Sequence, residues 1–315
     1  MNDLPPAPRG RGDEKPTLAI TGGTGFVGRH LLRIAVEAGH PVRALARAPQ
    51  APQPGITWVI GTLAAPGDLC AGADTVIHIA GVINARVPDE FLAGNVAGTA
   101  SILAAASAAH VRRLVNVSSL AAREPALSLY GASKAAAEAL VAASLLDHVT
   151  IRPPGVYGPG DRETLMVYSL AQRGFAVLPG PGRFSMIEVG DLARALLALA
   201  ASDLSGVYEI DDGTPGGHSH AELADAVAAA LHRRVRQVRL PVSALRIGAV
   251  IDTLLARRSG TLPRLSFDRA RYLAHPDWVA APARQLPRTI WEPQVALADG
   301  IAATAAWYRS AGWLD

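Results

Sequence analysis

Residues 17–28, TLAITGGTGFVG, join a short apolar run to glycines that recur at intervals of three, Gly22, Gly25 and Gly28. The apolar run is typical of a strand buried in a parallel sheet. Glycines at this spacing permit a tight turn and let backbone N–H groups approach a pyrophosphate at the start of the next helix. Because a strand pattern precedes them and a helical pattern follows, the segment predicts a dinucleotide-binding turn rather than a ligand-free tight loop.

Strand and helix patterns alternate along the rest of the first 212 residues. Such alternation implies right-handed crossovers between parallel strands. The predicted fold class is therefore α/β, with a doubly wound, parallel, Rossmann-type sheet and a smaller C-terminal substrate lobe. The predicted strands span 17–23, 41–47, 56–61, 74–81, 113–119, 149–158 and 206–212, and the main predicted helices span 26–38, 95–109, 130–146, 189–202 and 220–232.

The domain boundaries follow changes in composition. Residues 1–15, rich in Pro, Gly and charge, predict a disordered tail. Residues 16–158, with 183–212 returning to them, are expected to form the dinucleotide-binding domain. The loop-rich stretch 159–182 and residues 213–315, which end in a helix, are expected to form a partly interleaved substrate lobe above the carboxyl ends of the strands.

Composition excludes several classes of protein. Half of the 315 residues are hydrophobic, which excludes global disorder. The net charge of +3 is spread along the chain without a Lys/Arg block, so no nucleic-acid partner is expected. The single cysteine, Cys70, excludes an internal disulfide and a cysteine-based zinc site, and no metal is expected. With no stretch of about 20 apolar residues and no signal peptide, we expect a cytoplasmic protein without a membrane span.

The segment YGASK places Tyr130 and Lys134 four residues apart, on one face of a predicted helix. Lys134 is one of only two lysines in a chain with 28 arginines, which favours a role that arginine cannot fill over an ordinary solvated position. A neighbouring ammonium is expected to lower the pKa of the Tyr130 phenol. The pair would then move a proton to or from a carbonyl or alcohol while a nicotinamide carries hydride.

Three further polar residues are candidates for the same site. Ser118 and Ser119 end a predicted strand, and Ser119 is favoured over Ser118 as the hydroxyl that orients the substrate, against a plain capping role. Asn95 begins a predicted helix, where it either caps the helix or organises backbone and water near Lys134.

The second predicted strand favours NADP(H) over NAD(H). A carboxylate at its end would bind a ribose 2′-hydroxyl, whereas an arginine would bind a 2′-phosphate. Residues 41–60 contain no Asp or Glu, and Arg47 ends the strand, four residues after Arg43. The alternative is that both are ordinary surface arginines.

These motifs together resemble the extended short-chain dehydrogenase/reductases, the NAD(P)-dependent epimerase/dehydratase superfamily, over residues 16–310. The resemblance is carried by TGGTGFVG at 21–28, HIAG at 78–81, NVAGT at 95–99, NVSS at 116–119, YGASK at 130–134, RPPGVYGPGD at 152–161 and the C-terminal stretch 291–309. Within the family, VRALAR at 42–47 is similar to NADPH-using members that resemble dihydroflavonol reductases.

The resemblance implies roles for individual residues. Tyr130 would be the acid/base, Lys134 would bind the nicotinamide ribose, and Ser119 would orient the substrate. The implied cofactor-binding residues are Gly22, Gly25, Phe26, Val27, Gly28, Arg47, Leu63, Ala80, Gly81, Tyr130, Lys134, Pro153 and Val156. Relatives also form homodimers through the helices around 96–109 and 130–146, so a homodimer is one expectation for this chain, although intramolecular packing explains their apolar faces equally well.

The chain departs from the sugar-nucleotide epimerases of the family. Gly61-Thr62 stands where Gly-Asp is common, which leaves an adenine contact open. Arg183 is offset from the usual diphosphate-binding arginine, and Glu188 stands where histidine is common. Arg183 is either a ligand for an anionic substrate group or a surface residue.

The leading hypothesis is an NADP(H)-dependent carbonyl reductase or alcohol dehydrogenase that acts on a small organic substrate. One alternative is a nucleotide-sugar epimerase or dehydratase with tightly bound NAD. Another is a non-catalytic cofactor-binding subunit of a larger complex, against which the intact Tyr130–Lys134 pair argues.

Overall fold

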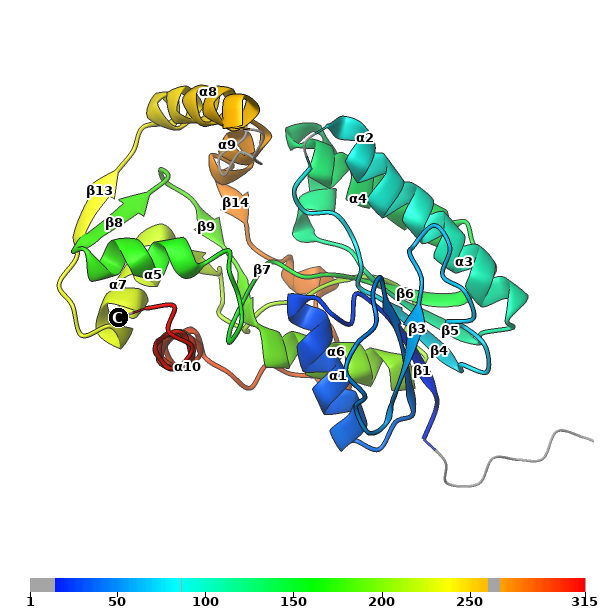
Figure 1. Ribbon diagram of the computed structural model, residues 1–315. Coiled ribbons are helices and arrows are strands. Elements are labelled where there is room, and N and C mark those ends of the chain that lie inside the picture. The colour runs from blue at the N-terminus through cyan, green and yellow to red at the C-terminus, as the bar shows by residue number, and fades with distance from the viewer. Residues whose placement is uncertain (1–14, 86, 260–266, 315) are drawn as a thin grey trace, which may run out of the picture.

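The computed structural model describes residues 15–85, 87–259 and 267–314. At its centre lies a sheet of seven parallel strands in the order β11-β6-β5-β4-β1-β2-β3 (Figure 1). This is the doubly wound Rossmann order with one more strand beside β6, which confirms the predicted fold class. The strands are β1 (Leu18–Thr21), β2 (Val42–Ala46), β3 (Ile56–Ile60), β4 (Thr75–His78), β5 (Arg113–Val117), β6 (Asp147–Arg152) and β11 (Gly206–Glu209).

The central strands are apolar along their length because the sheet is covered on both faces. All four residues of β1 are buried, and so are all five of β5. Strand β1 lies between β2 and β4, so that Leu18 pairs with Val42 on one side and with Thr75 on the other. The strand order reverses at β1, and such a reversal opens a crevice at the carboxyl ends of the strands.

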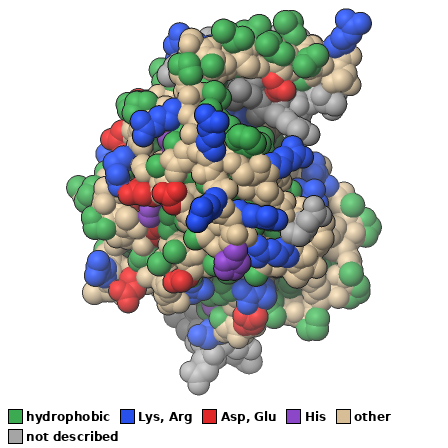
Figure 2. All heavy atoms as spheres, turned by 90° about the vertical axis from the view of Figure 1, so that its left-hand side faces the viewer, with side chains coloured by type: hydrophobic (Ala, Val, Ile, Leu, Met, Phe, Trp, Pro, Cys, Tyr) green, Lys and Arg blue, Asp and Glu red, His purple; other side chains and the backbone are tan. Residues whose placement is uncertain are grey.

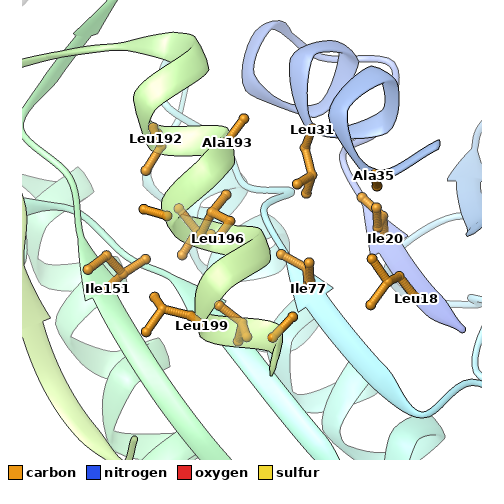
Figure 3. Close-up of a cluster of buried hydrophobic side chains, with 14 of the residues drawn as sticks. Leu18, Ile20, Leu31, Ala35, Ile77, Ile151, Leu192, Ala193, Leu196 and Leu199 are labelled. Atoms are coloured by element: carbon orange, nitrogen blue, oxygen red, sulfur yellow. The ribbon is translucent and has the colours of Figure 1, made fainter. Parts of the chain in front are cut away.

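Helices α1 (Phe26–Glu37) and α6 (Val189–Ala201) cover one face of the sheet. Figure 3 shows their apolar side chains meeting those of the strands beneath. Full burial of each leucine contributes about 1.5–3 kcal/mol, so this layer is a main source of stability. The labelled members are Leu18, Ile20, Leu31, Ala35, Ile77, Ile151, Leu192, Ala193, Leu196 and Leu199.

The opposite face is covered by α4 (Leu129–Ala142) and by one continuous helix made of α2 (Pro88–Phe91), a π-helical turn η1 (Leu92–Ala97) and α3 (Gly98–Ala108). The helix predicted to begin at residue 95 therefore begins at Pro88. Proline in the first turn and acidic residues there favour that start, because they suit the free N–H groups and the dipole of a helix N-terminus.

This continuous helix, Pro88–Ala108, also qualifies the expectation that no apolar stretch is long enough to span a membrane. It has 21 residues and a mean hydropathy of 1.4, which suffices by length and composition alone. In the fold, however, it is the crossover between β4 and β5, and its Asn95 and Thr99 are buried in hydrogen bonds with neighbouring segments. We therefore assign it to the Rossmann layer.

The remaining described chain forms a smaller lobe beside the carboxyl ends of the strands (Figure 1). Its strands are β7 (Gly155–Tyr157), β8 (Phe175–Leu178), β9 (Arg183–Phe184), β10 (Met186–Glu188), β12 (His218–Ser219), β13 (Arg236–Arg239) and β14 (Asp277–Trp278). Its helices are α5 (Leu165–Gln172), α7 (His220–Ala230), α8 (Val242–Ser259), α9 (Phe267–Leu273) and α10 (Leu297–Ser310). Short 3₁₀ turns are η2 (Leu120–Arg123) and η3 (Pro125–Leu127), which connect β5 to α4, and η4 (Pro282–Arg284).

Part of the lobe is more regular than the sequence predicts. Helix α5 and strand β8 lie within 159–182, which was expected to be loop-rich. They are held by partners far along the chain: Tyr168 packs edge-on against Tyr308 of α10, with ring centroids 5.0 Å apart, and β8 pairs with β13. The predicted tail lies almost entirely outside the described residues, and the predicted domain boundaries stay a prediction.

Candidate active site

The glycine turn between β1 and α1 leaves no room for side chains at two of its three positions. Gly22 has a φ of +75°, and a Cβ built on it would lie 2.9 Å from the backbone nitrogen of Ala80. A Cβ on Gly28 would collide with the carbonyl oxygen of Gly22, so only glycine lets α1 pack this closely on the turn. Helix α1 begins at Phe26 with no side-chain cap and no acidic residue in its first turn, which suits a bound pyrophosphate.

A cleft of about 600 Å³ extends from this turn to the start of α4, along the carboxyl ends of the strands. Fourteen of the predicted site residues line it, and Asn95 is the predicted residue that does not. The lining members are Gly22, Gly25, Phe26, Val27, Gly28, Arg47, Leu63, Ala80, Gly81, Ser119, Tyr130, Lys134, Pro153 and Val156. Residues so far apart in sequence meet here because parallel strands end at one edge of the sheet.

The two arginines of the second strand differ in their surroundings. Arg43 donates to the backbone carbonyls of Leu69 and Asp68 and pairs with the Asp68 carboxylate at 2.9 Å, so it fastens a loop to the sheet. Arg47 follows β2 directly, is exposed and lines the cleft. Within the described chain, Arg47 makes no hydrogen bond or ion pair that would compete for a ligand. Of the two, Arg47 is the one placed to meet a phosphate.

Buried polar groups fasten the ends of β1 and β4 together under the cleft. The Thr21 hydroxyl lies 2.8 Å from Nδ1 of His78 and accepts hydrogen bonds from the N–H groups of Ile79 and Ala80. Burial, followed by the charge of Lys134, lowers the pKa of His78 to about 3, so the ring is neutral at physiological pH. His78 is thus a packed structural histidine.

Tyr130 lies in the first turn of α4, which Ser128 caps by accepting a hydrogen bond from the Gly131 N–H at 3.0 Å. The phenol is hydrogen-bonded to Ser119. Burial raises the pKa of Tyr130 above its usual value, and the hydrogen bond with Ser119 lowers it only in part. The expected lowering of this pKa by Lys134 is therefore wrong for the structure: the phenol is held protonated, which is the form that donates a proton.

Lys134 is buried one turn further along α4. Its Nζ donates a hydrogen bond to the carbonyl oxygen of Val117 at the end of β5, over 2.7 Å. Burial lowers the pKa of Lys134 to about 8, with Glu138 acting in the opposite direction. The ammonium thus stands at the floor of the cleft as a cation whose charge is costly to bury.

Asn95 is not a helix cap, because it lies inside the π-helical turn η1, three residues after that turn begins. Its Oδ1 accepts from the N–H of Val82 at 2.7 Å, and its Nδ2 donates to the carbonyl of Val82 and to the hydroxyl of Ser133. The side chain therefore ties the loop after β4 to α4. Of the two predicted roles, organising the backbone beside Lys134 agrees with these contacts.

The two serines that follow β5 face different neighbours. Ser119 contacts the Tyr130 phenol and accepts a hydrogen bond from the N–H of Ala121 at 3.2 Å. The Ser118 hydroxyl is buried at the cleft wall and has no partner within the described chain. The contact with Tyr130 favours Ser119 as the residue beside the reacting oxygen.

Arg183 and Glu188 serve the fold of the lobe. Arg183 donates to the backbone carbonyls of Gly216 and Gly217, at 2.6 and 2.5 Å, and does not line the cleft. Glu188 caps α6 by accepting from the N–H groups of Gly190 and Asp191. Neither side chain is placed to hold a substrate diphosphate. Among the residues that the structure describes, no group of three His, Cys, Asp or Glu is arranged around a metal position.

The residues present fit a dinucleotide. The turn at Gly22 and Gly28 accommodates backbone and phosphate where a Cβ would not fit, and the uncapped start of α1 offers N–H donors. At the other end of the cleft, Tyr130, Ser119 and Lys134 supply a protonated phenol, a hydroxyl and a cation. This set can exchange a proton with a carbonyl or alcohol oxygen.

A family model described as "NAD dependent epimerase/dehydratase family" matches residues 18–210. The chain belongs to this family. It is an NAD(P)-dependent oxidoreductase of the extended short-chain dehydrogenase/reductase type, as the sequence resemblance predicted.

Curated relatives with similar sequences are named as reductases. Ceramide reductase of Caulobacter vibrioides is 38% identical over 313 residues, covering 96% of this chain and 97% of that protein. The 2-alkyl-3-oxoalkanoate reductase of Stenotrophomonas maltophilia is 32% identical and covers 90% of this chain and 97% of that protein. This chain is thus an NAD(P)-dependent reductase of the short-chain type, in the branch away from the UDP-sugar enzymes.

Solved structures show the same fold at lower identity. WbmG of Bordetella bronchiseptica, solved with NAD, gives a TM-score of 0.73 at 22% identity, with 98% of each chain covered. A human epimerase family protein solved with NADPH gives 0.72 at 22% identity, covering 92% of this chain and 99% of that one. Because these neighbours hold different nucleotides and are distant in sequence, they support the fold and not a choice of cofactor.

Proposed function

We propose that this chain is an NADP(H)-dependent carbonyl reductase that converts a ketone on an apolar, long-chain molecule to an alcohol. The observation that carries the proposal is the Tyr130 phenol, hydrogen-bonded to Ser119 in the cleft that begins at the glycine turn, where burial raises the pKa of the phenol. A proton donor held in its neutral form suits the reductive direction.

The chain's own residues supply proton transfer and orientation. When bound, a reduced nicotinamide supplies the hydride. As the carbonyl oxygen of the substrate takes up negative charge, Tyr130 donates its proton to that oxygen, and the product is an alcohol. The Ser119 hydroxyl, beside the phenol, orients the carbonyl oxygen. A proton from solvent then restores the Tyr130 phenol, and Lys134 lines the same cleft one turn further along α4.

The choice of NADP(H) rests on Arg47. Its guanidinium is exposed at the end of β2 and lines the cleft, whereas the neighbouring Arg43 is already engaged with Asp68 and Leu69. Residues 41–60 hold no carboxylate that would repel a 2′-phosphate or bind a 2′-hydroxyl.

The substrate class is supported by what the relatives are named for. The names of two relatives describe substrates with an oxo group and a hydrocarbon chain. These are the 2-alkyl-3-oxoalkanoate reductase and a farnesyl-dihydroquinoline-oxide ketoreductase of Stigmatella aurantiaca. A third is named for a lipid, ceramide. In this chain Arg183 is engaged with backbone carbonyls and is not available for a diphosphate, which favours an apolar ketone over a nucleotide sugar.

The test is turnover by the purified full chain, measured as consumption of NADPH with a 3-oxo-acyl lipid amide and, separately, with dTDP-glucose and UDP-glucose. We expect turnover of the ketone and none of the sugar nucleotides. Tyr130→Phe should lower kcat by about 10²–10⁴. Tyr208→Phe, in β11 and away from the cleft, is the matched control and should leave kcat unchanged.

Either of two outcomes would contradict the proposal. Unchanged turnover in Tyr130→Phe would remove the proposed acid. Conversion of a sugar nucleotide, with stoichiometric NAD released when the purified protein is denatured, would instead assign the chain to the epimerases or dehydratases.

A further inference from the structure

Helix α8 of the lobe carries a row of large apolar side chains on its solvent side. The row consists of Ile247, Val250, Ile251, Leu254 and Leu255, each between 52 and 61% exposed, and we refer to these five residues as the α8 stripe. Their spacing of three and four residues aligns them along one face of the helix for two turns. In an ordinary surface helix this face would turn to the core.

The buried face of α8 carries fewer and smaller apolar side chains than the exposed α8 stripe. Its buried apolar residues are Leu245, Ala249 and Ala256, and the first two pack with Ala270 of α9. The helix thus buries one leucine and two alanines while it exposes two isoleucines, two leucines and a valine. A contiguous exposed apolar row of this kind marks an interaction surface rather than scattered surface residues.

Positive charge surrounds the α8 stripe. Residues 239–259, which contain α8, hold four arginines and one aspartate, a net charge of +3. Arg246 and Arg258, near the two ends of the stripe, are exposed. Figure 2 shows hydrophobic side chains gathered at the upper end of the molecule, where α8 lies in Figure 1, with Lys or Arg side chains beside them.

Helix α8 lies at the same end of the molecule as α2 (Figure 1). The chain around α2 also carries exposed apolar residues, Ile83, Val87 and Leu92, and Ile83 lines the cleft. Helix α9, which backs α8, is fastened to the start of α4 by a hydrogen bond from the Leu129 N–H to Asp268. The stripe is therefore linked to the wall that carries Tyr130.

We propose that the α8 stripe docks this protein on the surface of an anionic lipid bilayer. Amphipathic helices of this type lie in the interface, with apolar side chains among the acyl chains and arginines at the headgroups. Charge complementarity selects this occupant: a second copy of the chain would bring the same positively charged segment against this one, whereas anionic headgroups attract it.

The test is flotation of the full chain with NADPH on vesicles of phosphatidylcholine alone and of phosphatidylcholine with phosphatidylglycerol in a roughly two-to-one ratio. We expect the wild-type chain to partition at least tenfold more strongly onto the anionic vesicles, and added salt to weaken this binding. The variant Ile251→Asn/Leu254→Asn should lose at least tenfold in partition. Leu145→Asn/Met166→Asn, which removes two other exposed apolar residues, is the matched control and should bind like the wild type.

The proposal is overturned if the stripe variant floats as well as the control, if zwitterionic vesicles bind equally, or if the wild type fails to float and instead forms a dimer that the stripe variant loses. Each variant is also assayed with a short water-soluble ketone, whose turnover the stripe substitutions should leave unchanged. Absence of that turnover in the wild type would count against the proposed reductase function, while the flotation result would still decide the docking surface.

Discussion

Helices α6 and α8 carry similar apolar stripes but turn them in opposite directions. In α6, Leu192, Leu196 and Leu199 are fully buried against the sheet (Figure 3). In α8, Ile251, Leu254 and Leu255 are more than half exposed. A pattern of apolar residues therefore predicts that a helix has an apolar face, but only the tertiary structure shows what that face packs against.

The same contrast separates the two halves of the molecule. Around the glycine turn, Gly22 and Gly28 lie close to backbone atoms of neighbouring residues, and the polar groups of Thr21, His78 and Asn95 are paired. In the lobe, α8 is anchored on a narrow, alanine-lined face and leaves its large side chains to solvent. We expect substitutions around the glycine turn to lower the free energy of unfolding strongly, and those at its exposed edges to have smaller effects. Substitutions on the exposed face of α8 should leave the free energy of unfolding nearly unchanged.

Gly28→Ala should have the largest effect. Its Cβ would meet the carbonyl of Gly22 and the Cα of Gly23, which are backbone atoms that cannot step aside without moving α1 from β1. We expect a loss of about 3 kcal/mol or more in the free energy of unfolding, with weaker NADPH binding. Urea unfolding and nucleotide titration measure the two effects.

Gly155→Ala is the control for that substitution. A Cβ at Gly155 would lie 3.9 Å from Cε of Met186, which is ordinary van der Waals contact. Its cost should stay below about 1 kcal/mol. Equal costs for the two variants would mean that the glycine turn is not sterically special.

Much of this first region could be predicted from the sequence, for physical reasons. Parallel strands buried on both faces are short apolar runs, and the chain carries such runs at β1, β4 and β5. The turn glycines and the Tyr130–Lys134 spacing lie in contiguous segments, so local geometry suffices to place them. Because strand ends share one edge, the cleft followed from the topology.

What could not be predicted depends on burial. The direction of the Tyr130 pKa is set by desolvation, which the spacing to Lys134 does not reveal. The start at Pro88 had a local signal, a proline followed by Asp89 and Glu90, that the alanine-rich stretch after it obscured. Helix α8 shows helical spacing in the sequence, but spacing does not say that its apolar face turns outward.

Arg47→Ser tests an exposed position at the edge of the cleft, near the glycine turn. Loss of a charge-assisted contact with the 2′-phosphate should raise the Kd for NADPH about 10–100-fold and leave the Kd for NADH within about twofold. Arg33→Ser, an exposed arginine on α1 that pairs with Glu37, is the matched control and should change neither Kd. Equal losses for NADPH and NADH would show that Arg47 does not select the nucleotide.

Lys134→Met should stabilise the nucleotide-free protein. Because burial lowers the pKa of Lys134 from 10.5 to about 8, the folded state binds fewer protons than the unfolded state between those values. The free energy of unfolding of the wild type therefore rises with pH in that window, and below pH 8 the full cost of the buried charge is present. That cost is about 3 kcal/mol, and in the methionine variant the lost hydrogen bond to Val117 offsets about 1 kcal/mol of the gain.

We therefore expect Lys134→Met to gain about 1–2 kcal/mol at pH 7 and to show a smaller rise in stability between pH 8 and 10.5. Urea unfolding across this range measures both. The control is Lys134→Arg, which keeps a charge at the site and should not be more stable than the wild type at pH 7. If Lys134→Met is less stable than the wild type at pH 7, the Lys134 ammonium stabilises the folded protein, and the prediction is wrong.

Leu254→Ala should have the smallest effect on folding, within about 0.5 kcal/mol, although it removes a large apolar side chain from a helix. Leu196→Ala, the same change in α6, should cost about 2–5 kcal/mol because the residue is fully buried and its removal leaves a cavity. Urea unfolding of both variants, at two protein concentrations, tests the contrast directly. A cost above about 1 kcal/mol for Leu254→Ala that grows with protein concentration would mean that α8 is buried against a second copy in solution. A cost near zero at both concentrations leaves the stripe free for a surface that is absent from the unfolding experiment, as an anionic bilayer would be.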